Sequence, residues 1–348
     1  MTIEQLSNRF VTFSKKECAG SSDLYEYLAM NISEDDELLR LCTYAREGQP
    51  VPNLLFSAVH YLLLKGTEHP LRDYYPSIVA EPKPVEFSYP AFKDFCKIHR
   101  DAITHLLQNK LVQTNEVRRC AYLFPLFSHI YDRVNKPLSL IEIGTSAGLQ
   151  LLWDKYRYSY GTGEGFGNEK SNVHIHSEIK GDVQLQSMNI PPVATRVGLD
   201  LHVSDLRDPE DHLWLKALIW PEHDERIELF EQASQCIQEN QVDLMEGDGV
   251  ALLNEVVEEL PKDTAICIFH THVANQIPEE MKRTLLEKIR KIGEKRDVFH
   301  IYNNMWDRKL HLDSFINGTE YNEIIGDTDG HGRWFEWNLN TAYVGTSR

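Results

Sequence analysis

The sequence predicts an α/β protein in which a Rossmann-like sheet domain with a C-terminal antiparallel hairpin follows a mainly helical N-terminal domain. Three observations predict this arrangement. Apolar residues recur at helical spacing up to about Asp132, and short apolar runs alternate with amphipathic stretches after Pro137. A glycine-bearing turn, residues 144–148, follows the first of these runs.

The N-terminal domain is expected to span residues 1–135 and to consist of helices. Apolar side chains lie three or four positions apart, as in the runs from Leu54 to Leu63 and from Val117 to Leu126. Glycine and proline interrupt this pattern at Gly48–Pro50, and prolines do so again between His69 and Pro90. Loops are expected at both places.

The second domain, residues 136–348, is expected to alternate strands with helices. Each predicted strand is a short apolar run: 138–143, 195–201, 242–245, 264–269 and 298–303. The predicted helices are 149–158, 249–259 and 279–293, and residues 211–240 are expected to form one or two helices. A glycine-rich insertion and an extra strand, 173–179, come after the first helix. The hairpin is expected from 321–325 and 333–339, joined by the turn residues Asp327–Gly330.

Composition restricts the partners. The chain has 348 residues, of which 42% are hydrophobic, enough for a sizeable core. Its 53 acidic residues outnumber the 36 basic ones, and the net charge of -17 repels nucleic-acid phosphates and anionic membranes. We therefore expect a small-molecule or protein substrate, with neither duplex nucleic acid nor a membrane as partner.

The cysteines and the N-terminus predict a cytoplasmic protein. The six cysteines form no C-x-x-C pair, which fits reduced, buried thiols. Residues 1–13 mix polar side chains among apolar ones and lack the apolar core of a signal peptide. The longest apolar stretches are too short to span a bilayer.

The turn after the first predicted strand is the first candidate ligand site. Gly144 and Gly148 allow a tight turn and a close approach of a ligand to the backbone, with Thr145 and Ser146 between them. A helix N-terminus there offers N–H groups to a carboxylate or phosphate, and the carboxylate of a bound methionine would suit it. A G-x-x-x-G turn is also compatible with helix packing alone.

Acidic residues end three successive predicted strands. Glu142 lies in the first strand, Asp200 ends the second, and Asp248 follows the third beside Gly247. Asp200 is the candidate acceptor for both hydroxyls of a ribose, and Asp248 for an adenine amino group. A dinucleotide site would instead show G-x-G-x-x-G. Either aspartate can also be an ordinary helix N-cap or loop residue.

His270 ends the fourth predicted strand, at the edge where open α/β sheets place reacting groups. It is the candidate base, or a substrate contact, because a neutral imidazole can take a proton near pH 7. A hydrogen-bonded structural histidine is the alternative. The H-x-H pairs 174/176 and 270/272 lack a completing ligand, so no metal site is predicted.

A dense polar segment, 113–119, precedes the first strand. Gln113, Asn115, Glu116 and Arg118 could line a substrate pocket. Glu116 and Arg119 lie three positions apart, as in an ordinary surface ion pair, which is the alternative.

Several of these segments resemble an uncharacterised bacterial family, a domain of unknown function, whose second half is similar to class I S-adenosylmethionine-dependent methyltransferases. The residues that carry the resemblance are 52–55, 58–64, 113–117, 141–149, 198–200, 214–215, 220–221, 247–248, 269–271 and 331–332. The resemblance implies a helical region before a methyltransferase-like fold. The chain departs from the family pattern at Thr145, where a smaller residue is frequent, and at His202-Val203.

The sequence therefore predicts an S-adenosylmethionine-dependent methyltransferase. Its cofactor would lie among Glu142, residues 144–148, Asp200 and Asp248, with His270 near the acceptor. In such enzymes the protein mainly aligns the acceptor, and a base is needed only when the acceptor holds a proton. A non-catalytic ligand- or partner-binding protein on the same fold is the alternative, and a nicotinamide-dependent oxidoreductase is a third possibility.

Overall fold

The computed structural model describes residues 1–113, 115–181 and 188–339. By their contacts they form two compact units, Met1–Thr114 with Arg207–Glu228 (unit 1) and Asn115–Leu206 with Leu229–Arg348 (unit 2). The predicted domain boundary at residue 136 stays a prediction, because the two units are defined by contacts in space and each consists of two separate segments of the chain. In the described chain no helix is long and apolar enough to cross a membrane.

Unit 1 is helical, as the apolar spacing predicts. Among its described residues the elements are α1 (Ile3–Phe13), η1 (Ser14–Cys18), α2 (Asp23–Ile32), α3 (Asp36–Cys42), α4 (Val51–Leu64), η2 (Pro70–Tyr74), η3 (Val85–Phe87), α5 (Ser88–Ile98), α6 (Arg100–Asn109) and α8 (Pro209–Ala217). Stacked aromatic rings, among them Tyr25 and Phe56 with centroids 4.2 Å apart, form its core. The helix α9 (Asp224–Glu239) begins in unit 1 and continues in unit 2.

Unit 2 contains a seven-stranded sheet in the order β11-β10-β9-β8-β1-β6-β7. The strands are β1 (Leu138–Ile143), β6 (Val193–Asp200), β7 (Asp243–Glu246), β8 (Ala265–His270), β9 (Val298–Tyr302), β10 (Leu310–Ile316) and β11 (Thr319–Gly326). The first five pair in parallel, whereas β10 is antiparallel to both of its neighbours. The predicted mixed α/β class with a mostly parallel sheet is confirmed.

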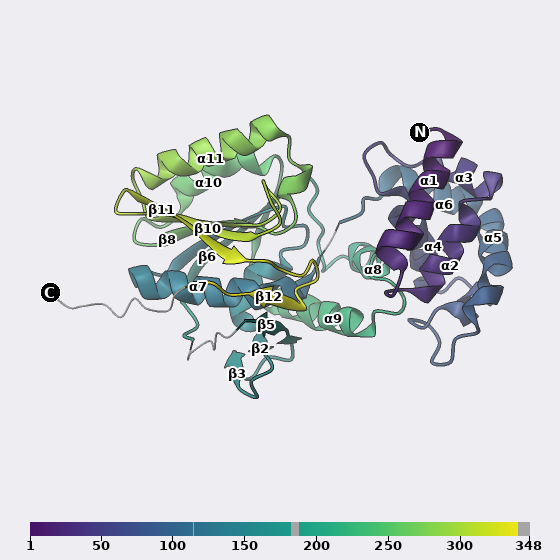
Figure 1. Cartoon of the computed structure of the whole chain (residues 1–348), viewed down its shortest axis with the longest axis horizontal. Coiled ribbons are helices and arrows are strands. Elements are labelled where there is room, and N and C mark those ends of the chain that lie inside the picture. Colours follow the sequence, from purple (N-terminus) through teal and green to yellow (C-terminus); the bar gives the residue numbers. More distant parts are fainter. Residues whose placement is uncertain (114, 182–187, 340–348) are drawn as a thin grey trace. The chain divides into compact units, whose positions relative to one another are not determined.

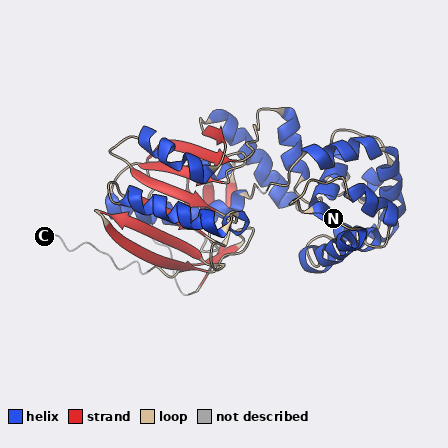
Figure 2. Cartoon of the chain, turned by 90° about the horizontal axis from the view of Figure 1, so that it is seen from above, coloured by secondary structure: helices blue, strands red, loops and turns tan. Residues whose placement is uncertain are grey.

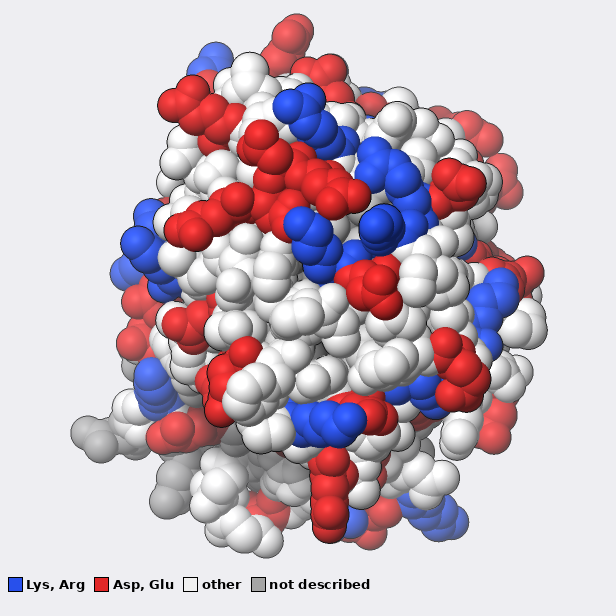
Figure 3. Space-filling view, turned by 90° about the vertical axis from the view of Figure 1, so that its right-hand side faces the viewer, with Lys and Arg blue, Asp and Glu red and all other residues white. Residues whose placement is uncertain are grey.

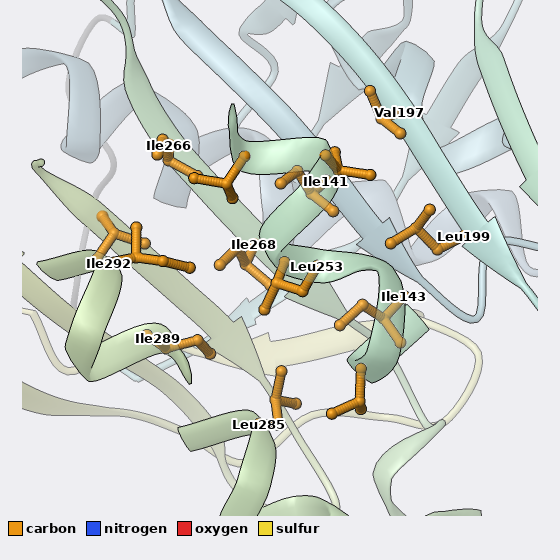
Figure 4. Packing of buried hydrophobic residues seen from close by; sticks show 14 of the residues in the cluster. Ile141, Ile143, Val197, Leu199, Leu253, Ile266, Ile268, Leu285, Ile289 and Ile292 are labelled. Carbon is orange, nitrogen blue, oxygen red and sulfur yellow. The ribbon is translucent and has the colours of Figure 1, made fainter. Parts of the chain in front are cut away.

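Helices cover both faces of this sheet (Figures 1 and 2). Their bounds are α7 (Cys120–Val134), α10 (Gly249–Glu259) and α11 (Glu279–Gly293), with the short η4 (Val117–Arg119) and η6 (Ala274–Gln276). Figure 4 shows Ile141, Ile268, Leu253 and Leu285 together in the core beneath α10 and α11. On the opposite face Phe127 of α7 packs edge-on against Phe269 of β8. Alternate strand residues therefore face different helices.

One predicted helix is wrong, and the insertion after it contains more strands than expected. The helix expected at 149–158 is a 3-10 helix, η5 (Leu149–Lys155), kinked at Leu152, and β2 (Arg157–Ser159) follows it. Six of its seven residues are buried, so tertiary packing overrides the helical periodicity. The insertion that follows forms β3 (Gly165–Gly167), β4 (His174–His176) and β5 (Glu178–Lys180), in two small sheets.

The C-terminal region contains an additional hairpin that the sequence analysis did not predict. It is formed by β10 and β11 around Asn317-Gly318, whose φ angles of 51° and 76° suit a type I′ turn. The expected second strand corresponds to β12 (Trp334–Glu336), which pairs in parallel with β5 in a separate sheet. The expected hairpin is also present. The N–H groups of Asn338 and Glu336 donate to the carbonyls of Ile325 and Asp327, and the N–H of Asp329 donates to the carbonyl of Trp334, each at 2.9 Å. Thr328 and Phe335 form an antiparallel bridge in this pairing.

Candidate functional site

The carboxyl edge of the parallel strands is the candidate site, at the point where β1 and β8 are neighbours. From β1 the sheet continues to β6 and β7 in one direction and from β8 to β9 in the other. Open α/β sheets bind ligands at such a reversal of strand order, outside the carboxyl ends of the strands. The loops after β1 and β8 contain residues 144–148 and 271–273.

The two loops contact each other at Gly144. This residue has φ 76°, and a Cβ at its position would lie 2.4 Å from Cγ2 of Val273. Ser146, with φ 51°, is left-handed although it is not glycine. Glycine is therefore required at 144 both for its backbone conformation and for space.

All the N–H groups of the turn 144–148 are hydrogen-bonded within the chain. Gly144 and Thr145 donate to the carbonyl of Leu199, Ser146 to the Asp200 carboxylate, Ala147 to the Asn115 amide oxygen, and Gly148 to the carbonyl of Thr145. The turn leads into the seven-residue η5 instead of an α-helix. The donors proposed to receive a ligand carboxylate are thus engaged.

Two carboxyl groups flank the turn. Glu142 is 3% exposed and accepts the Thr145 hydroxyl proton at 2.6 Å. Burial, and to a lesser extent the nearby Asp200, raises the pKa of Glu142 to about 8, against the lowering effects of Thr145 and Arg119. Asp200 accepts N–H bonds from Ser146 at 2.7 Å and from His202 at 3.0 Å, one on each oxygen.

Thr145, the departure from the family pattern, is accommodated by Gly198 on β6. A Cβ at Gly198 would lie 2.6 Å from the Thr145 methyl group and 2.6 Å from its hydroxyl oxygen. The threonine side chain therefore occupies space that a glycine on the neighbouring strand leaves free, and its hydroxyl is directed to Glu142.

At the end of β7, Asp248 is the N-cap of α10. Its carboxylate accepts the N–H groups of Val250 at 2.8 Å and Ala251 at 3.1 Å. Glu246, which the sequence did not single out, is exposed and lies 3.5 Å from Nδ1 of His202. Gly247 has φ 153° and joins the strand to the cap.

His270 is fully buried on the sheet face covered by α10 and α11. Its Nε2 lies 3.1 Å from Nε2 of His300 on β9, and the two neutral rings share one proton in that bond. Burial lowers the pKa of His270 to about 4. These surroundings are those of a hydrogen-bonded core histidine, and the role of His270 as a base stays a prediction.

The next residues of this loop form a polar network. The Thr271 hydroxyl donates to Gln150, and the Thr271 carbonyl accepts from the Arg119 guanidinium at 3.2 Å. His272 donates its backbone N–H to Asn303 at 2.8 Å, and its Nδ1 lies 2.9 Å from the Asn304 amide nitrogen. The loops after β8 and β9 are thereby joined through side chains.

The polar segment before α7 is divided between the units. Gln113 belongs to unit 1, while Asn115, Glu116 and Arg118 belong to unit 2. Asn115 donates to the Ser146 hydroxyl at 2.8 Å, so it contacts the candidate site. Glu116 is buried and pairs with Nδ1 of His331 at 3.0 Å, and Arg118 is also buried.

Among the described residues, unit 1 lines the following two hollows. One, of about 330 Å³, is lined by residues that include Arg9, Glu17 and Asn53. The other, of about 490 Å³, is lined by Asp35, Lys93 and further acidic residues, with Lys93 2.5 Å from Asp35. Figure 3 shows acidic and basic side chains lying next to one another on this side of the molecule. Such paired surface charges are typical of a solvated face.

Five residues of the site were not predicted as site residues from the sequence: Arg119, Glu246, His272, Asn303 and Asn304. Arg119 appeared only as a surface ion-pair partner, yet it is 6% exposed. The position of His272, Asn303 and Asn304 just after two adjacent parallel strands is the signal that could have identified them.

Comparison with known proteins identifies a family. The profile of the family described as "Uncharacterized protein conserved in bacteria (DUF2332)" matches residues 7–337. The chain belongs to this family. No curated protein and no solved structure matches the DUF2332 chain. The expected uncharacterised bacterial family is confirmed, and the similarity to methyltransferases stays a prediction.

Proposed function

We propose that this DUF2332 protein is an S-adenosylmethionine-dependent methyltransferase, with the cofactor at the carboxyl edge of unit 2. The observation that carries the proposal is a pair of carboxylates on adjacent strands. Glu246 ends β7 and Asp200 ends β6. Glu142, before the turn after β1, is buried and keeps its proton at neutral pH, so it adds a hydrogen-bonding group but no charge. Acidic groups attract the positive sulfonium and accept hydrogen bonds from ribose hydroxyls.

Asp200 fits the ribose role. Each of its oxygens accepts one backbone N–H and keeps further acceptor capacity, because an ionised carboxylate has about four acceptor positions. The same bonds fix the orientation of the carboxylate before a ligand arrives. A pre-oriented acceptor lowers the entropy cost of binding.

The turn does not fit a ligand carboxylate in the same way, because each N–H of residues 144–148 already has an acceptor. A methionine carboxylate would need donors from elsewhere on the edge, and Arg119 is a charged donor close enough to lower the pKa of Glu142. This observation favours the alternative function, a non-catalytic ligand- or partner-binding protein.

Few catalytic groups are needed for the proposed reaction. S-adenosylmethionine supplies the methyl group, and the protein positions an acceptor for in-line attack. The acceptor would be a small molecule or a protein, and it would lie toward β8, on the other side of the strand-order reversal from Asp200.

Isothermal titration of the full chain with S-adenosylmethionine, S-adenosylhomocysteine and NAD tests the proposal. We expect the two adenosyl ligands to bind, with Asp200→Asn weakening both. Asp243→Asn is the matched control, because Asp243 lies at the opposite end of β7 and should leave affinity unchanged. Thermal shift gives a second readout, since a ligand at about 100 times its Kd stabilises by about 2.7 kcal/mol.

Binding of neither adenosyl ligand would overturn the cofactor assignment and favour the non-catalytic alternative. Binding of NAD alone would favour an oxidoreductase. Adenosyl-ligand affinity that is equal in Asp200→Asn and the parent chain would show that the ribose lies elsewhere.

A further inference from the structure

Three non-glycine residues with left-handed backbones lie at the carboxyl ends of three adjacent strands. Ser146 follows β1, His272 follows β8 with φ 57°, and Asn304 follows β9 with φ 56°. The left-handed region is disfavoured for such residues and is found repeatedly at binding and catalytic sites. The strain at His272 and Asn304 is therefore a pointer to function on the β8–β9 side of the edge.

The partner of His272 determines its tautomer. The amide nitrogen of Asn304 lies 2.9 Å from Nδ1 of His272, so Nδ1 accepts and the ring proton is on Nε2. Burial, followed by the positive charge of Arg119, lowers the pKa of His272 to about 3, so the ring is neutral. Within the described part of the chain Nε2 is buried and has no hydrogen-bond partner.

Asn303 supplies a second donor. Its side chain is 0% exposed, and its Oδ1 accepts the backbone N–H of His272 at 2.8 Å, which fixes the amide orientation. Among the residues that the structure describes, none accepts a hydrogen bond from its Nδ2. The Tyr122 hydroxyl lies close to the Asn303 side chain, which partly offsets the rise that burial causes in the pKa of Tyr122. Among the described residues, neither the Tyr122 hydroxyl nor Nδ2 of Asn303 has a hydrogen-bond partner.

Two buried donors without acceptors are costly unless something accepts from them. A buried polar group without a partner costs about 1–3 kcal/mol. Arg119 adds positive charge at the same place, since its guanidinium donates to the carbonyls of Thr271 and Gly330. The Cβ position of Gly330 lies 3.8 Å from Cε1 of His272, so the imidazole and the Arg119 anchor are neighbours. This cluster suits an anionic oxygen.

We propose that Nε2 of His272 and Nδ2 of Asn303 form an oxyanion site that binds the carboxylate of a small molecule. Asn304 sets the tautomer that makes His272 a donor, and Arg119 contributes the favourable charge. The site goes beyond the proposed methyl transfer and does not depend on it, because it requires no adenosyl ligand.

Nuclear magnetic resonance of the full chain labelled with 15N-histidine tests this site without S-adenosylmethionine. Sodium acetate is the probe, acetamide the neutral isostere, and sodium chloride the ionic-strength control. His272→Gln assigns the imidazole signal. We expect a saturable shift of the His272 Nε2 signal with acetate, and no such shift with acetamide or chloride.

Two variants remove the donors separately. Asn303→Asp keeps the oxygen that accepts the His272 N–H but replaces Nδ2 with an oxygen. In Asn304→Asp the new carboxylate accepts a hydrogen bond from Nδ1 of His272, so the ring proton moves to Nδ1 and Nε2 becomes an acceptor. Each is expected to weaken acetate binding about tenfold or more, as the loss of a charge-assisted hydrogen bond does.

Asn317→Asp is the matched control, because it alters another left-handed asparagine, in the β10–β11 turn, where Asp-Gly is as suitable as Asn-Gly. It should bind acetate like the parent. Failure of acetate to shift His272, an equal response to acetamide, or a response to inorganic phosphate alone would overturn the carboxylate assignment. Undiminished acetate binding in a folded Asn304→Asp variant would overturn the role of the tautomer.

Discussion

Glu142→Gln should make the protein more stable at neutral pH. The carboxyl group of Glu142 is buried, and its pKa is raised from 4.5 to about 8. The folded state therefore holds a proton that the unfolded state releases above about pH 4.5. Since stability falls wherever the folded state binds more protons, this group destabilises the fold as the pH rises from about 4.5 to 8. Glutamine has the same shape and carries no such proton.

The expected magnitude follows from the pKa difference. Between the two pKa values the loss approaches about 1.4 kcal/mol for each pH unit, which amounts to about 2–3 kcal/mol between pH 5 and pH 7. The free-energy gain of Glu142→Gln should therefore be about that much larger at pH 7 than at pH 5. The amide oxygen of glutamine can still accept the Thr145 hydroxyl proton, so this hydrogen bond is retained.

Urea unfolding of both proteins at a series of pH values measures this difference. Glu255→Gln, at an exposed position of α10, is the control and should change little at any pH. Parallel pH profiles for Glu142→Gln and the parent would refute the reasoning, because they would mean that Glu142 ionises at the same pH in the folded and unfolded states.

Three further predictions concern the packing of unit 2. Gly144→Ala should lower the free energy of unfolding by about 1–2 kcal/mol because its backbone is left-handed, and by about 1–3 kcal/mol more because the new Cβ overpacks against Val273. Val273→Ala should remove the overpacking cost. If the two substitutions are additive in a double-mutant cycle measured by urea unfolding, the contact is contradicted. Burial lowers the pKa values of His270 and His300, so the protein should lose stability as the pH falls from about 6.5 to 4. The double variant His270→Leu/His300→Leu should not show this loss in acid-unfolding curves. An acid transition that is the same in the variant and the parent would argue against a neutral histidine pair. Arg296→Lys should lower the free energy of unfolding by about 1–2 kcal/mol, because a lysine cannot replace the guanidinium hydrogen bonds to carbonyls within residues 257–264. Thermal unfolding measures this loss, and an unchanged Tm would contradict it.

The bounds of β1, α10 and α11 could be predicted to the residue, since each has a clear local signal. β1 is buried along its whole length and reads as an apolar run, and α10 has an aspartate cap and apolar residues at helical spacing. The helix after Gly148 could not be predicted. Its residues show helical periodicity, yet the chain forms a 3-10 helix there, kinked at Leu152 and with six of seven residues buried.

The hairpin around residues 327–330 was predictable, since backbone hydrogen bonds join residues 325–329 to 334–338 in antiparallel pairing. A second hairpin, between β10 and β11, was missed. Its turn, Asn317-Gly318, is the strongest kind of short hairpin signal.

The positions of Glu142 and Asp200 were predictable because the ends of parallel strands meet at one edge. Their surroundings were not. No sequence pattern shows that Asp200 accepts the N–H of Ser146, 54 positions away, or that burial raises the pKa of Glu142. Both depend on contacts between segments that are distant in the chain.

The left-handed backbones at the sheet edge indicate that particular side chains are needed there. Where the turn needs only a left-handed backbone or space, the chain has glycine, as at Gly144 and Gly148. At Ser146 and His272 it has residues that strain the backbone, and both side chains are hydrogen-bonded, to Asn115 and Asn304. Glycine would relieve the strain and lose these contacts. Side chains kept at such a cost, beside the buried carboxyl of Glu142, make this edge the place to search for the ligand.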